Sequence, residues 1–270
     1  MPPQPDPQTR FVPQDLWLIG AAVSAWLWTV VRAHHQAIIV DEAWTYNNFV
    51  WRLAPAHWEG ASNNHLLNSL LMRFFTSVFG VSHLTVRAPA LIGGALFIWA
   101  AYLLSKLLTA RRLLQTTIFV ALTFNPFVFD YLIVGRGYAL AVAFLMTGIA
   151  LVAQAQSRVA SGLPSSVPRA CAISSACFAV SFCANFSFAF IDASALLAVA
   201  VWCCLSTYES SRARIILTCA APASIVIAAV PSWTILHWPP GELYAGATSL
   251  ARTFGSVARK RRSTKSIRTS

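Results

Sequence analysis

The chain has 270 residues, of which 57% are hydrophobic and only 11% are charged. Because soluble domains carry about 25% charged residues, this composition excludes a water-soluble globular protein and indicates helices that cross a bilayer. The net charge of +11 does not indicate a nucleic-acid partner, since the basic residues are scattered between apolar segments or gathered in the last 19 positions.

The apolar segments predict an all-α, polytopic membrane protein of about seven transmembrane helices. Residues 1–13 are Pro-rich and polar and are expected to form a disordered tail, followed by a transmembrane domain over residues 14–254. Pro126 falls inside the third expected span and should kink it. The expected spans cover residues 16–33, 88–108, 116–134, 138–155, 170–190, 193–205 and 215–236.

The distribution of Lys and Arg predicts the orientation of these spans. If the N-terminus lies in the cytoplasm, the short inner loops are denser in Lys and Arg than the outer ones, as the positive-inside rule requires. The long segment 34–82 then forms an outer loop. Residues 255–270 are basic and polar and are expected to be disordered. After seven spans this tail would also lie outside, which favours a truncated or frame-shifted C-terminus.

Two amphipathic helices are expected in the outer loop. The first begins at Asp41 and places apolar residues at helical spacing as far as Leu53, and the second begins near Asn64 and His65 with a stripe of Leu, Phe and Val. Both would lie along the membrane surface. Asp41 is either the N-cap of the first helix or, with Glu42, a functional carboxylate pair. Asn64 and His65 are likewise either cap residues or polar site residues.

Five motifs within residues 16–155 carry a resemblance to a known family. They are Asp41-Glu42-Ala43, Asn64-His65-Leu66-Leu67-Asn68, Arg87-Ala88-Pro89-Ala90-Leu91, Asn125-Pro126-Phe127 and Gly135-Arg136-Gly137-Tyr138-Ala139-Leu140. This pattern resembles the GT-C type membrane glycosyltransferases: protein mannosyltransferases, aminoarabinose transferases and their bacterial relatives. The chain departs from the family at Val134, where an acidic residue is common. Asp130, four residues earlier, is the expected substitute. The family also has more spans and an outer C-terminal domain.

The resemblance implies an enzyme of the bacterial inner (plasma) membrane, acting on cell-envelope glycans. The donor would be a polyprenyl-phosphate sugar and the acceptor a hydroxyl on a lipid, glycan or protein. Such a transfer needs a base for the acceptor proton and positive charge or a divalent metal at the departing phosphate. Asp41 would be the base, with Glu42 orienting the acceptor or holding a metal. Arg136 and Arg87 would bind the phosphate. The expected donor or acceptor contacts are Asn64, His65, Asp130 and Tyr138.

Two other interpretations stay open. The chain is an inactive remnant of such an enzyme, or it is a transporter-like membrane protein. A transporter predicts charged residues near mid-span or broken helices in two matching halves, whereas the acidic residues here lie at the outer ends of the spans. Among them, Asp192 is expected to be a helix cap.

The six cysteines all lie within apolar segments, with no Cys-x-x-Cys motif and no accompanying His. This pattern predicts small apolar fillers of helices, and neither a disulfide nor a metal site is expected. They are Cys171, Cys177, Cys183, Cys203, Cys204 and Cys219.

Overall fold

The structure, a computed structural model, describes residues 15–51, 64–163, 167–206 and 212–236. Every secondary-structure element in these segments is a helix, which confirms the all-α prediction. In chain order they are α1 Leu16–His35, α2 Val40–Thr45, the π-helical turn η2 Tyr46–Val50, α3 Leu66–Phe79, α4 His83–Leu108, α5 Arg112–Thr123, α6 Pro126–Tyr131, α7 Tyr138–Ala160, α8 Val167–Ala184, the 3-10 turn η4 Phe186–Phe188, α9 Ala189–Ser206, α10 Arg212–Ala229 and α11 Ser232–Leu236.

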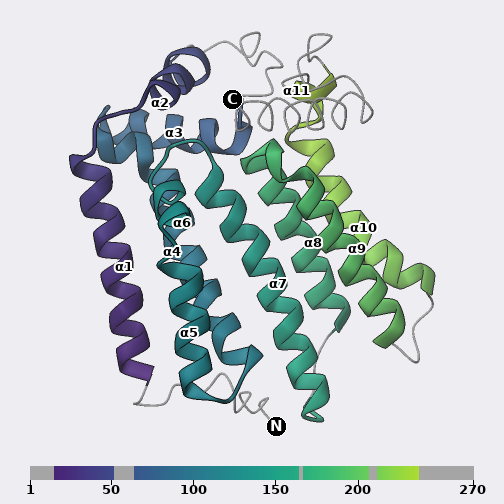
Figure 1. Ribbon diagram of the computed structural model, residues 1–270. Helices are drawn as coiled ribbons and strands as arrows, with labels where there is room; N and C mark the ends of the chain where they lie inside the picture. Colours follow the sequence, from purple (N-terminus) through teal and green to yellow (C-terminus); the bar gives the residue numbers. More distant parts are fainter. Residues whose placement is uncertain (1–14, 52–63, 164–166, 207–211, 237–270) are drawn as a thin grey trace, which may run out of the picture.

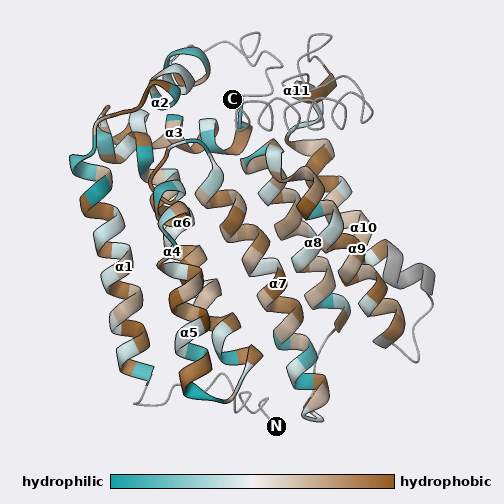
Figure 2. Ribbon diagram, in the orientation of Figure 1, coloured by the Kyte–Doolittle hydropathy of each residue, from teal (hydrophilic) through white to brown (hydrophobic). Residues whose placement is uncertain are grey.

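Five helical stretches are long and apolar enough to cross a membrane: α1, α4, α7, α8 and the run Phe186–Leu205, which covers η4 and α9 up to Leu205. They lie side by side (Figure 1). Hydrophobic residues occupy most of their length, while hydrophilic residues gather near the helix ends and around α2 (Figure 2). The chain is therefore a multi-pass membrane protein. Five helices, and not the predicted seven, meet the length and hydropathy of a span, so the seven-span count is not confirmed.

The predicted third span, residues 116–134, is broken into two short helices. α5 ends at Thr123, and the side chain of Asn125 accepts a hydrogen bond of 3.0 Å from the backbone N–H of Phe127 as the N-cap of α6. Pro126 therefore begins a helix and does not kink one, because a proline at the first helical position gives up no hydrogen bond. Together α5 and α6 return the chain from the end of α4 to the start of α7 (Figure 1).

The boundaries of the later spans also differ from the prediction. α8 ends at Ala184, well before residue 190, because Asn185 starts the turn η4 by accepting a hydrogen bond of 2.9 Å from the backbone N–H of Ser187. Asp192 consequently lies in the first turn of α9 and is not a cap. The expected seventh span, 215–236, is divided between α10 and α11. The predicted tails, 1–13 and 255–270, lie outside the described residues.

α4 packs against α1, α3, α5 and α7, while α8 packs against α7, α9 and α10. The crossing of α4 and α7 depends on Gly93, where a Cβ would lie 2.6 Å from the carbonyl carbon of Ala139. Without a side chain at this position the two backbones approach closely, as is common between helices in membranes. The buried side chains around this crossing include Phe97, Ile98 and Leu132.

α3 lies crosswise over the ends of the long helices, on the same side as α2 (Figure 1). Its Met72 and Thr76 are buried, whereas Leu70, Phe74 and Val78 are exposed. The predicted apolar stripe is therefore partly turned outward, which suits a helix at the level of lipid headgroups. We call this end of the molecule, which carries α2, α3 and the segment between α6 and α7, the α2–α3 end.

Candidate functional site

The sequence-predicted site residues converge at the α2–α3 end, around the segment 132–137 that joins α6 to α7. At its centre, Glu42 of α2 and Arg87 of α4 form a buried ion pair. The Arg87 Nε donates to Glu42 Oε1 at 2.9 Å, and Nη2 donates to Oε2 at 2.7 Å. This two-point geometry is the strongest form of the interaction between guanidinium and carboxylate.

The remaining donors of Arg87 bind the C-terminal end of α1. Its Nη1 donates to the carbonyl oxygens of Ala33 and Gln36 at 2.9 and 2.8 Å, and its Nη2 also donates to that of Ala37 at 2.8 Å. A guanidinium has five N–H groups, and the protein itself satisfies all five here. The predicted phosphate-binding role of Arg87 therefore has no donor available in this conformation; the side chain instead ties α1, α2 and α4 together.

Glu42 is equally occupied. Besides Arg87, its Oε1 accepts from the backbone N–H of Gly135 at 2.8 Å and its Oε2 from that of Ile39 at 3.0 Å. Asp41 is not the N-cap of α2, because Ile39 holds that position and the third helical residue, Glu42, binds its N–H. Glu42 is thus a buried positioning residue that fixes the start of α2 and the segment before α7.

Asp41 precedes Glu42 in the chain, and Arg136 follows Gly135, whose N–H group Glu42 binds. Asp41 and Arg136 form a second ion pair. The Nη1 of Arg136 lies 2.5 Å from Oδ2 of Asp41. The Asp41 side chain is 58% exposed and that of Arg136 is 13% exposed. A carboxylate open to solvent therefore lies directly on a guanidinium that is mostly covered by protein.

Two glycines allow the segment beside this pair to approach its neighbours. Gly137 has φ +78°, in the left-handed region, and a Cβ there would lie 1.9 Å from the carbonyl oxygen of Ala184. A Cβ on Gly135 would lie 3.1 Å from the carbonyl oxygen of Val86 and 3.4 Å from Glu42 Oε1. The two glycines therefore allow the backbone to pass closely between α4 and the end of α8, and this positions Arg136 between those helices.

His65, at the start of α3, is buried beneath this segment. Its ring centroid lies 6.2 Å from those of Tyr138 and Phe186. Neither ring nitrogen has a hydrogen-bond partner among the described residues. Burial, and secondarily the positive charge of Arg136, lower the pKa of His65 to about 3, so the ring is neutral at physiological pH.

Other buried polar atoms near the segment also lack partners within the described residues. They are Oγ1 of Thr45 and Oδ1 of Asn68, although Nδ2 of Asn68 donates to the carbonyl oxygen of Gly135 at 2.8 Å. The side-chain oxygen of Asn64 has a hydrogen-bond partner, because Oδ1 accepts from Ser69 Oγ at 3.0 Å. Buried polar atoms without partners are rare in proteins, and both ring nitrogens of His65 and Oδ1 of Asn68 are such atoms beside this segment.

The last two predicted residues lie at the edge of the site. Tyr138 begins α7 and is half-buried, with its ring 4.7 Å from that of Tyr131. Asp130 is exposed and pairs with Arg32 at 2.8 Å, and so does not take the place of an acidic residue beside Arg136. Asp130 and Val134 do not share a helical face, because α6 ends at Tyr131, between the two residues.

Sequence reasoning missed two residues that bind the segment 132–137: Asn68 and Asn185. Asn185 donates from Nδ2 to the carbonyl oxygen of Arg136 at 3.3 Å, and so holds the segment from the side of α8. Asn68 lies within the quoted Asn-His-Leu-Leu-Asn motif, so its spacing of one helical turn from Asn64 offered a signal. No sequence signal pointed to Asn185, whose contact with residue 136 depends on how α8 packs on α7.

Comparison with models of protein families, with curated protein sequences and with solved structures found no match for this chain. Within the described residues, no three His, Asp or Glu side chains gather closely enough to share a metal ion. The geometry of the site itself is an exposed carboxylate, Asp41, on a guanidinium, Arg136, and the chain neighbours of these two residues are joined by the hydrogen bond from Gly135 to Glu42.

Proposed function

We propose that the protein is a membrane glycosyltransferase that moves a sugar from a polyprenyl-phosphate carrier to a hydroxyl acceptor. The observation that carries the proposal is the contact between Asp41 and Arg136 at the end of the membrane helices. One group is a base and the other an anion ligand, and a glycosyl transfer from a phosphate needs both.

Asp41 suits the part of the base because its carboxylate is exposed on the outer surface of α2. An acceptor hydroxyl arriving from the aqueous side reaches it without disturbing the buried Glu42–Arg87 pair. The acceptor oxygen attacks the anomeric carbon, its proton passes to Asp41, and the lipid phosphate leaves with the bonding electrons.

Arg136 suits the departing phosphate. Guanidinium binds phosphate through two parallel N–H donors, and Arg136 is mostly covered by protein, which strengthens its interaction with an anion. The exposed apolar residues of α3 support a position of the site at headgroup depth, where the phosphate of a lipid carrier would lie. In this mechanism Arg136 exchanges the Asp41 carboxylate for the donor phosphate, and Asp41 is then available as base.

Glu42 and Arg87 act on this reaction through position. Glu42 binds the backbone N–H of Gly135, next to Arg136, and is itself next to Asp41 in the chain. One buried carboxylate therefore sets the separation of the two reacting side chains, and Arg87 holds that carboxylate in place. This assignment replaces the direct roles that the resemblance implies for Glu42 and Arg87.

We further propose that the N-terminus is cytoplasmic and that the α2–α3 end faces the outer side of a bacterial inner membrane. The density of Lys and Arg in the short loops supports this orientation. The acceptor then belongs to the cell envelope, as a lipid, glycan or protein hydroxyl.

The test is transfer of a radiolabelled sugar in membranes that contain the expressed protein, with a panel of polyprenyl-phosphate sugars as donors. Asp41→Asn should lower the rate about 10²–10⁴-fold, because a positioned base is lost. The matched control is Asp130→Asn, which breaks the Asp130–Arg32 pair at the same end of the molecule and should keep the wild-type rate. Equal rates for Asp41→Asn and wild type would contradict the proposed base. A wild-type protein that transfers none of the sugars would favour the inactive remnant.

A further inference from the structure

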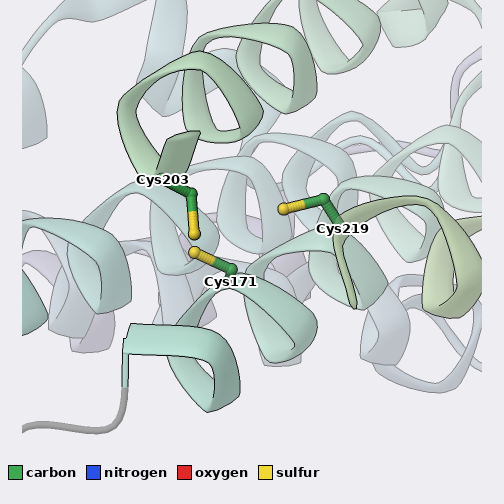
Figure 3. A group of neighbouring side chains, drawn as sticks. All are labelled: Cys171, Cys203 and Cys219. Carbon is green, nitrogen blue, oxygen red and sulfur yellow. The ribbon is translucent and has the colours of Figure 1, made fainter. Parts of the chain in front are cut away.

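Three cysteines from three helices meet in the interior of the helix bundle. Cys171 lies on α8, Cys203 on α9 and Cys219 on α10, and their sulfur atoms all lie within 4.8 Å of one another. Figure 3 shows the three side chains pointing toward a common centre. Each residue is at most 2% exposed. The sequence predicted only apolar fillers at these positions. The three cysteines are up to 48 residues apart in the chain, and no local pattern predicts that they come together in the fold.

The surrounding helices hold this cluster in place. The hydroxyl of Ser175, one turn after Cys171 on α8, donates to the carbonyl oxygen of Cys219 and accepts from the backbone N–H of Ala223 at 3.2 Å. Ser175 thus bridges a carbonyl and an N–H of α10 that are one helical turn apart. This bridge fixes the position of Cys219 along α10 relative to Cys171 on α8. The two sulfurs face each other because these contacts hold the backbones of the two helices in register.

From this arrangement we propose that Cys171, Cys203 and Cys219 bind one monovalent copper ion, Cu(I). A metal bound in the plane of three sulfurs at about 2.3 Å separates them by about 4 Å, which the present spacing meets with small shifts. Thiolates are the ligands that soft metals select.

The number of ligands and the surroundings distinguish Cu(I) from other thiophilic ions. Zn²⁺ in structural sites and iron–sulfur clusters take four protein ligands, and no His, Asp, Glu or further Cys of the described residues joins the group. The cluster is packed in apolar surroundings that include Val167, Phe178 and Val199. Such apolar surroundings suit a soft ion that is bound by sulfur alone. Each thiol that coordinates as thiolate releases its proton to solvent on binding.

The copper site is separate from the proposed transferase site. Cys171 precedes Ala184 by 13 residues on α8, and Ala184 contacts Gly137 at the α2–α3 end. At 1.5 Å per residue this places Cys171 about 20 Å along the helix from that end. Copper binding at this site therefore does not depend on glycosyl transfer.

The experiment uses the purified full chain in detergent, reduced and without oxygen, titrated with Cu(I) in competition with the chromogenic chelator bicinchoninate. Wild type should take one equivalent of Cu(I). A triple variant of Cys171, Cys203 and Cys219 to Ala should bind at least about 100-fold more weakly. The matched control is the triple variant of Cys177, Cys183 and Cys204 to Ala, which removes the same number of thiols and should bind as wild type does.

X-ray absorption on copper-loaded wild type provides a second measurement that needs no variant. We expect three sulfur neighbours at about 2.3 Å. Equal copper binding by the two triple variants, nitrogen or oxygen neighbours at the metal, or no binding by wild type would each overturn the proposal. So would a disulfide between two of these three cysteines, identified by peptide mapping of protein purified under reducing conditions.

Discussion

Glu42 and Arg87 are 45 residues apart in the chain and form a buried ion pair in which both side chains also bind backbone of other segments. Arg87 binds three carbonyl groups at and just after the C-terminal end of α1, and Glu42 binds the N–H groups of Ile39 and Gly135. Four separate parts of the chain therefore meet at one pair of charges. The pair of Asp41 and Arg136 lies beside this contact, because Glu42 and Gly135 are their chain neighbours.

Glu42→Gln should destabilise the fold by about 3–5 kcal/mol, because the charge of Arg87 is left buried without a counter-ion. The new amide nitrogen would also face an N–H donor in place of an acceptor oxygen. The measurement is the unfolding midpoint in detergent. Asp41→Asn is the matched control: its side chain is more than half exposed, so its loss should cost less than about 1 kcal/mol. Similar midpoints for the two variants would contradict the structural role of Glu42.

Gly137→Ala should prevent the segment before α7 from packing against the end of α8. The φ of +78° costs any other L-residue about 1–2 kcal/mol, and the added Cβ would clash with the carbonyl oxygen of Ala184. We expect a loss of more than about 3 kcal/mol. Gly162→Ala separates the two causes, because Gly162 has φ +66° but open space around its Cβ. Gly162→Ala should show only the backbone penalty; an equal loss in both variants would mean that the close contact with α8 is unimportant.

His65 should make the stability of the protein depend on pH. Its pKa of about 3 in the folded state is below the unfolded value of about 6.5, so below pH 6.5 the unfolded chain binds a proton that the folded chain does not. Stability is therefore complete above pH 6.5 and falls as the pH is lowered toward 3, by about 2 kcal/mol at pH 5. Unfolding midpoints at pH 7.5 and 5.0 measure this change. His65→Gln should remove most of the difference, and a variant with the wild-type pH dependence would show that other groups cause it.

The orientation in the membrane can be tested by labelling single cysteines with a membrane-impermeant thiol reagent, in a background without the native cysteines. Trp44 is exposed on α2, and Leu113 is exposed near the start of α5, at the opposite end of the helices. Trp44→Cys should label in intact cells, and Leu113→Cys should label only after lysis. The reverse pattern would place the α2–α3 end in the cytoplasm and remove the support for an envelope acceptor.

Local features of the sequence determined the class of the protein and several of the residues at its site. Apolar runs near 20 residues predicted membrane helices because hydropathy and helical length are properties of short segments. Asp41, Glu42, Arg87 and Arg136 were singled out by the motifs around them. Pro126 was misjudged because a proline can kink a helix or begin one, and the adjacent Asn125 decided the outcome by capping α6.

Only the tertiary structure decided which charges meet. Asp41 and Glu42 are neighbours with the same chemistry, yet one is 58% exposed and the other is fully buried. Their partners lie 95 and 45 residues away, and those contacts depend on how α2, α4 and the segment before α7 pack. The proximity of Cys171, Cys203 and Cys219 likewise could not be predicted from the sequence. Pairing across a helix bundle is set by the packing of whole helices, because the partner of a side chain lies on another helix and not on its own.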